Sequence, residues 1–257
     1  MPEQQLTRRD RYRRRTVAEI KEAAMAQVRA GGPEALSLAA IARTMAMSAP
    51  ALYRYFAGRD ELLAELAVDA HLALACTLEA AAAGATTPAS RLRAVAVAYR
   101  EWALAQPHAY RLACESPHGC VASAAQRSMN VLLDVVAEAG APPDAAIPAP
   151  LRAQLHRWND GPGQRGHPAG VLHFGLVWWS RLHGLISLEL AQHTVGTGID
   201  PGLLYRSEVE TMVDSLRHGV TIAPRALGCV ARRCTRQQCD GPLGCGDDRR
   251  TAEAEPT

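Results

Sequence analysis

The 257-residue sequence predicts an all-α fold in two parts, a small N-terminal helical domain and a larger C-terminal one. Three observations support this. In one segment after another, apolar residues recur at the i, i+3, i+4, i+7 spacing of a buried helical face. Glycine and proline separate the segments, as at Gly31-Gly32, Pro107 and the stretch 140–150. A chain of this length can bury the cores of one or two compact domains, and we predict two.

The N-terminus is strongly basic, although the net charge of the whole chain is only +2. Arginine occupies positions 8, 9, 11, 13, 14 and 15. We predict that residues 1–14 form a flexible basic arm, which can neutralise DNA phosphates or enter a minor groove. The alternative is a solvated tail without a defined role.

The first helix is predicted over residues 15–30. Its apolar stripe consists of Val17, Ile20, Ala24 and Val28. Gly31-Gly32 ends it, because glycine tolerates a left-handed cap. Residues 33–36 then lead to Ser37, which caps the next helix.

The stretch 37–63 predicts a helix, a tight turn and a second short helix. The buried face of the first of these two helices consists of Leu38, Ile41, Ala42 and Met45. Ala46 and Met47 make the turn. Ser48 is a good N-cap for the second helix, and we expect its hydroxyl to accept a hydrogen bond from the N–H of Ala51.

The outward face of the second helix is small, aromatic and basic, because Leu52 and Phe56 pack inward. Such a face suits a DNA major groove, where an arginine can bind guanine O6 and N7 with two hydrogen bonds. Arg54 is the candidate for this contact. The predicted DNA-contacting residues are Ser37, Thr44, Ser48, Ala49, Pro50, Ala51, Tyr53, Arg54, Tyr55 and Arg59, of which Thr44, Ser48, Tyr53, Tyr55 and Arg59 are expected to bond phosphates. The alternative is an ordinary helical hairpin inside a larger α-helical protein.

This stretch resembles the helix-turn-helix of the tetracycline-repressor (TetR) family of transcriptional regulators. The resemblance is carried by Ser37-Leu38, Ile41-Ala42, Met47-Ser48, Leu52-Tyr53-Arg54-Tyr55-Phe56 and Asp60-Glu61-Leu62-Leu63. Two positions depart from the family pattern, Ala46 in place of the usual glycine and Arg59 in place of the usual lysine. A left-handed Ala46 would be strained by roughly 1 to 2 kcal/mol. The resemblance implies a DNA-binding domain over residues 15–63 and an effector-binding and dimerisation domain over 64–220.

A long helix is predicted from Gly58 to about Ala83. Asp60 and Glu61 complement the positive end of its dipole. Its leucines and alanines can contact the DNA-binding domain near the start and the second domain further along. A ligand that tilts this helix would therefore move the DNA-reading helix.

The second domain is predicted to contain helices over residues 90–106, 107–115, 123–139, 169–192 and 203–218, with one or two turns over 151–158. The segments 140–150 and 159–168 are predicted loops, because both are rich in proline or glycine. The helix over 169–192 is apolar on more than one face, which implies burial both within its subunit and against a second one. Its segment 179–190 resembles the Trp, His, Gly signature of one C-terminal subfamily of these regulators. The predicted homodimer interface contains Trp179, Leu182, His183, Ile186, Met212 and Leu216.

Aromatic residues and methionine on facing helices can line a cavity for an apolar or aromatic effector. The candidates are Tyr99, Trp102, Tyr110, Met129, Leu133 and Trp178. The same side chains can instead simply fill the core. If so, the protein would be a DNA-binding protein without a ligand.

Seven cysteines, an odd number, and no secretory signal indicate reduced thiols and a cytoplasmic protein. Cys229, Cys234, Cys239 and Cys245 lie in a tail, residues 221–257, that we predict to be disordered. Their spacings lack the close pairs of cysteines that are typical of zinc sites, so no metal or cofactor is predicted, although a metal or redox site is the alternative.

The most apolar long stretch, residues 171–191, is interrupted by four polar or charged residues, His173, Arg181, His183 and Glu189. These interruptions argue against a membrane span.

An enzyme is the other class that we considered. Ser180, His183 and Glu189 share one helix, where their spacing cannot align a nucleophile, a base and an orienting group. No nucleophile elbow or phosphate loop appears elsewhere. The sequence therefore predicts a non-enzymatic homodimeric repressor that a small-molecule effector releases from a palindromic double-stranded operator.

Overall fold

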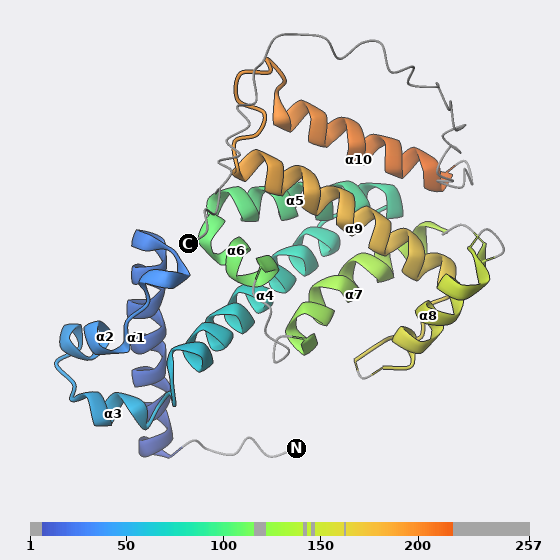
Figure 1. Cartoon of the computed structure of the whole chain (residues 1–257). Coiled ribbons are helices and arrows are strands. Elements are labelled where there is room, and N and C mark those ends of the chain that lie inside the picture. The colour runs from blue at the N-terminus through green and yellow to red at the C-terminus, as the bar shows by residue number, and fades with distance from the viewer. Residues whose placement is uncertain (1–6, 116–121, 141–142, 145–146, 162, 218–257) are drawn as a thin grey trace, which may run out of the picture. The chain divides into compact units, whose positions relative to one another are not determined.

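The computed structural model describes residues 7–115, 122–140, 143–144, 147–161 and 163–217. Every regular element in these ranges is helical, which confirms the predicted fold class (Figure 1). The elements are α1 (Arg8–Gly31), η1 (Pro33–Ala35, a 3₁₀ turn), α2 (Leu38–Thr44), α3 (Ala49–Tyr53), α4 (Arg59–Ala83), α5 (Pro88–Ala105), α6 (Pro107–Glu115), α7 (Ala122–Ala139), α8 (Ala149–Asn159), α9 (Ala169–Leu190) and α10 (Pro201–Arg217). We call residues 8–67 the head and residues 68–217 the body; both belong to one compact unit.

The first helix is longer than predicted, because α1 begins at Arg8. The Thr7 hydroxyl accepts a hydrogen bond from the Asp10 N–H at 3.1 Å, and the Asp10 carboxylate accepts one from the Thr7 N–H at 3.2 Å. This reciprocal cap starts a helix, and the negative charge of Asp10 interacts favourably with the positive end of the helix dipole. The prediction of a flexible arm is therefore wrong for residues 8–14, and residues 1–6 lie outside the described chain.

Apolar side chains from α1 to α4 form the core of the head. Its buried members include Ile20, Ala24, Val28, Leu36, Leu38, Ile41, Ala42, Leu52, Phe56, Leu62, Leu63 and Leu66. Gly32 has a φ of 77° at the end of α1, as the predicted glycine cap requires. The Lys21 ammonium on α1 pairs with Glu65 at 2.8 Å and Asp69 at 2.9 Å, both on α4. Polar contacts at the edge of the head thus hold α1 against α4.

Helix α4 runs from the head into the body (Figure 1). By length and composition it is the one helix of the described chain that could cross a membrane. Its apolar residues, however, bury against α1, α5, α6 and α7. This is the behaviour of the core helix of a folded domain.

The body surrounds the second half of α4 with α5, α6 and α7, and α9 and α10 pack on α5. The predicted bounds of α5, α6, α7, α9 and α10 agree with the observed ones within two residues, and α8 is longer than the one or two turns expected. Ion pairs also join the helices, three of them more exposed and Arg100–Glu189 largely buried: Arg127–Glu79, Arg93–Glu210, Arg100–Glu189 and Arg181–Glu208.

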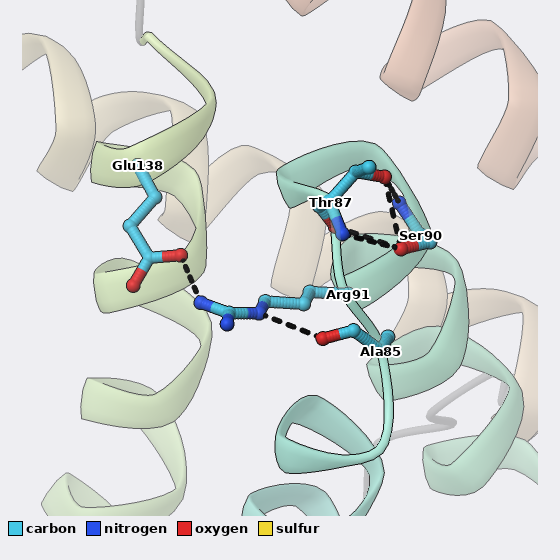
Figure 2. A network of polar contacts seen from close by, with 5 residues as sticks. All are labelled: Ala85, Thr87, Ser90, Arg91 and Glu138. Carbon is cyan, nitrogen blue, oxygen red and sulfur yellow. Dashed lines mark hydrogen bonds and ion pairs between the residues drawn. The ribbon is translucent and has the colours of Figure 1, made fainter.

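Arg91 ties the turn before α5 to α7 (Figure 2). Its Nε donates to the carbonyl of Ala85 at 3.1 Å, and its Nη1 donates to Glu138 at 2.5 Å. Thr87 and Ser90 cap the start of α5 reciprocally. One guanidinium on α5 therefore links the turn between α4 and α5 to α7.

His71 is a buried histidine on α4. Burial lowers its pKa below the usual value of 6.5, and a hydrogen bond to the backbone of Ala113 offsets this only in part. A lowered histidine pKa means that the unfolded chain binds more protons than the folded one. Stability from this site is thus fully present above pH 6.5 and is lost as the pH falls below that value.

We therefore expect the free energy of unfolding to decrease between pH 7.5 and 5, by at most about 1.4 kcal/mol per pH unit from this one histidine. His71→Gln should flatten that dependence in urea titrations. The matched control is His193→Gln at an exposed histidine, which should retain the wild-type profile. An unchanged profile in His71→Gln would contradict the assignment.

Candidate nucleic-acid interface

The turn between α2 and α3 contains a left-handed alanine. Ala46 has a φ of 51°. The N–H groups of Ala46 and Met47 donate to the carbonyls of Arg43 at 3.1 Å and Ala42 at 2.9 Å. These bonds close the end of α2 and hold Ala46 in a conformation that suits glycine better. The strain foreseen from the sequence is therefore present.

Helix α3 starts where the sequence predicts. The Ser48 hydroxyl accepts the N–H of Ala51 at 3.4 Å, and Pro50 lies in the first turn. Leu52 and Phe56 are buried, as expected. The helix spans five residues and ends at Tyr53, with Arg54 as its C-cap, so Phe56 lies beyond its end. Arg54 keeps right-handed helical backbone angles, so its side chain still leaves from the end of the helix.

Seven of the ten predicted contact residues are exposed in the folded chain. They are Ser37, Thr44, Ser48, Ala49, Pro50, Tyr53 and Arg54. Ala51 is partly buried. The exposed side of α3 thus combines two small residues, a tyrosine and an arginine. These are the kinds of side chain expected on a helix that reads a major groove.

Tyr55 and Arg59 are less exposed than expected. The Tyr55 ring packs against the core of the head, and the Arg13 guanidinium lies over it at 5.2 Å from the ring centroid. The Arg59 guanidinium donates to the carbonyl of Pro33 at 2.9 Å and pairs with Glu34 at 3.2 Å. Arg59 therefore joins η1 to the start of α4, so the phosphate contact predicted for it would need these bonds to break.

Arg43 was not among the predicted DNA-contacting residues. This residue is exposed in the last turn of α2, three residues before the left-handed turn. Its signal was its place on the polar side of that helix, opposite Ile41 and Ala42. Arg43 and Arg54 are the exposed cations that border the α2–α3 turn.

The predicted effector residues lie in the core of the body. Tyr99, Trp102, Tyr110, Leu133 and Trp178 are at most 5% exposed, and Met129 is partly buried. Leu133 packs so closely on Gly175 that a Cβ there would lie 2.5 Å from its Cδ2. Three surface hollows, of about 620, 270 and 280 Å³, are lined by other residues.

Two indole groups in this core are unusual. In the described part of the chain, the buried Nε1–H groups of Trp102 on α5 and Trp178 on α9 find no hydrogen-bond acceptor. A buried donor without an acceptor costs about 1 to 3 kcal/mol. Such groups call for a physical explanation, and a bound ligand is one.

The predicted dimer interface is wrong for four of its six residues. Leu182, Ile186, Met212 and Leu216 are at most 6% exposed within a single subunit. Trp179 stacks on Tyr99 with ring centroids 4.7 Å apart, and His183 contacts Tyr110, so both take part in contacts inside the subunit. Apolar periodicity identified a buried face correctly but attributed it to the wrong neighbour. The exposed apolar residues of α9 and α10 are instead Leu188, Leu203 and Leu204.

The cysteines of the predicted tail, Cys229, Cys234, Cys239 and Cys245, lie outside the described residues. Of the described cysteines, Cys76 is exposed and Cys114 is partly buried, and neither is in a disulfide.

Residues 20–66 match the family model described as bacterial regulatory proteins, tetR family, and residues 92–212 match that of the tetracyclin repressor-like C-terminal domain. The chain is 32% identical over 221 residues to the HTH-type transcriptional regulators Rv1816 of Mycobacterium tuberculosis and Mb1846 of Mycobacterium bovis. Those alignments cover 80% of this chain and 94% of each relative.

Two solved structures of bacterial regulatory proteins have a similar fold. The crystal structure of the regulatory protein SCO4313 is 39% identical, with a TM-score of 0.68, over 81% of this chain and 100% of that one. A bacterial regulatory protein in the tetR family from Rhodococcus RHA1 is 18% identical, with a TM-score of 0.53, over 78% of this chain and 96% of that one. The second similarity bears on the fold alone.

The strained turn generates a test. Ala46→Gly should raise the free energy of unfolding by about 0.5 to 1 kcal/mol, because relief of the left-handed strain exceeds the entropy cost of a glycine. Ala39→Gly, at an exposed position inside α2, should lower it by a similar amount. Urea denaturation of both variants measures the difference. Equal losses in the two variants would contradict the argument.

Proposed function

This chain belongs to the TetR family of DNA-binding transcriptional regulators, and on that premise we propose that it is a cytoplasmic homodimeric repressor. It would bind a palindromic operator, and a small-molecule effector would release it. The observation that carries the proposal is the exposed, capped helix α3 with Arg54 at its end.

The chemistry of α3 supports direct base readout. The guanidinium of Arg54 is suited to guanine O6 and N7, and Ala49 can touch a thymine methyl group. Ser48, Tyr53, Thr44 and Arg43 are exposed around it and can bond phosphates, which fix the register of the helix on the duplex. Arg54 would thus carry about 1 to 3 kcal/mol of sequence discrimination.

A dimer is required for a palindrome. Two copies of α3 must lie about 34 to 36 Å apart, one turn of DNA, or a multiple of that distance. The exposed leucines Leu188 on α9 and Leu203 and Leu204 on α10 support pairing of these two helices with a second copy, because exposed apolar groups favour burial.

An effector site is supported by the Trp102 and Trp178 indoles, since an effector with hydrogen-bond acceptors would satisfy both donors. A coupling of about 3 kcal/mol between effector and operator would weaken DNA binding about 150-fold. The dense core around Leu133 and Gly175 favours the alternative, a regulator that binds DNA without a ligand.

Selection of bound sites from random DNA tests the proposed function, with sedimentation of the complex to count subunits. We expect an inverted repeat bound by an even number of subunits. An absence of enrichment with a monomeric protein would refute the proposal.

Two substitutions separate the hydrogen-bonding geometry of Arg54 from its charge. Arg54→Ala and Arg54→Lys should both relax the preference at one base pair, because lysine keeps the charge and loses the two-bond geometry. Arg43→Ala is the matched control: it should weaken all DNA alike and reduce the salt slope by about 1. Specificity retained in Arg54→Lys would assign Arg54 to a phosphate.

The indoles can be tested with a thermal-shift screen of a compound library. A compound that stabilises the wild type should lose most of its shift in Trp102→Phe or Trp178→Phe, and should keep it in Trp158→Phe, at the partly buried tryptophan of α8. Retention of the full shift in both core variants would place the effector elsewhere.

A further inference from the structure

A polar cluster in the body joins α5, α6 and α9. The Tyr110 hydroxyl on α6 lies 2.7 Å from His183 Nδ1, 2.8 Å from Ser187 Oγ and 3.2 Å from the His183 carbonyl oxygen, all on α9. The Tyr99 hydroxyl on α5 lies 3.4 Å from the same Nδ1. Tyr99 and Tyr110 are each 1% exposed. The buried Tyr110 hydroxyl thus attaches the short helix α6 to α9, which is distant in sequence.

Several hydrogen bonds connect the members of this cluster. The Tyr110 hydroxyl has one proton, which it can donate to His183 Nδ1 or to the His183 carbonyl oxygen. Ser187 Oγ lies near both the Tyr110 hydroxyl, at 2.8 Å, and His183 Nε2, at 3.5 Å. Burial raises the pKa of Tyr99 above its ordinary value of 10, and its hydroxyl is protonated at neutral pH with or without this shift. Each member has a partner in this arrangement, and the Tyr110 hydroxyl has the central position.

The other side of α6 contacts the head. Leu112 is 1% exposed and belongs to the same apolar cluster as Leu62, Leu63 and Leu66 of α4 and Ile41 of α2. The backbone of Ala113, the next residue, also forms a hydrogen bond with His71 of α4. Within four consecutive residues, α6 thus bonds α9 and packs into the core that supports α3.

Helix α6 is only nine residues long. An isolated helix of that length is unstable in water, so its position depends on its tertiary contacts. A change in the contacts of Tyr110 should therefore also alter the packing of Leu112, half a turn away.

We propose that Tyr110 is a positioning residue for DNA binding: its hydroxyl holds α6 on α9 and, through Leu112, keeps the head in the arrangement that binds the operator. The state of the Tyr110–His183–Ser187 contact would then regulate operator affinity. This inference rests on the proposed function, because its measured quantity is operator affinity.

The test compares two buried tyrosines. Tyr110→Phe removes the central hydroxyl and leaves the ring. Tyr205→Phe is the matched control, since Tyr205 is 2% exposed and its hydroxyl donates to the carbonyl of Ala96 at 2.7 Å, joining α10 to α5. Both variants lose a buried hydrogen bond and should melt at lower temperature.

At a temperature where both variants are folded, we expect Tyr110→Phe to weaken binding of the selected operator at least about fivefold. Tyr205→Phe should stay within about twofold of the wild type, well below the lower end of that coupling range.

Two further measurements separate positioning from general stability. Hydrogen exchange of the α6 and α3 amides should accelerate in Tyr110→Phe and not in Tyr205→Phe. A double-mutant cycle with His183→Gln should show non-additive effects on operator affinity, because both changes break the same contact. Ser187→Ala, which removes only the 2.8 Å partner, should act in the same direction more weakly and serves if Tyr110→Phe does not fold.

Equal operator affinities in Tyr110→Phe and Tyr205→Phe would overturn the inference while leaving the proposed function intact. A wild-type chain that selects no DNA site would instead refute the proposed function itself. The two failures are therefore distinguishable in one set of binding curves.

Discussion

Burial of α4 along most of its length is the constraint on which the described structure depends. Its first half completes the core of the head with Leu62, Leu63 and Leu66, and its second half buries Leu74 and Leu78 among the helices of the body. One helix is thus common to both cores (Figure 1). An α-helix with its backbone hydrogen bonds intact is stiff over this length, so the head cannot move relative to the body without repacking apolar side chains around α4.

The head shows how a small unit holds an exposed helix of only five residues, α3. Such a helix has no intrinsic stability, so its start is set by the Ser48 cap and its inner face by Leu52 and Phe56. The entry into α3 requires a left-handed residue at Ala46, whose strain is offset by the packing around it. Polar contacts then hold the edges, with Arg13 over Tyr55 on one side and Arg59 against Pro33 on the other.

The body differs in using large aromatic side chains and buried polar groups. Tyr99 stacks on Trp179 and Tyr110 bonds His183, so two aromatic residues of the Trp, His, Gly segment meet two tyrosines from α5 and α6. Satisfied polar groups of this kind select one packing arrangement, because any other would leave them unpaired. The orphaned Trp102 and Trp178 N–H groups lie in the same domain.

The sequence by itself determined the local features. Helix boundaries at Gly32 and Pro107 and the Ser48 cap follow from the conformational limits of a few neighbouring residues, and the structure confirms them. Helical periodicity likewise identified Leu182, Ile186, Met212 and Leu216 as buried. Only the tertiary structure decided what these residues bury against, that Arg59 is held by Pro33 and Glu34, and that Tyr110 meets His183. The reason is physical: a periodic pattern specifies which face of a helix avoids water, whereas the partner of that face depends on contacts between residues far apart in the chain.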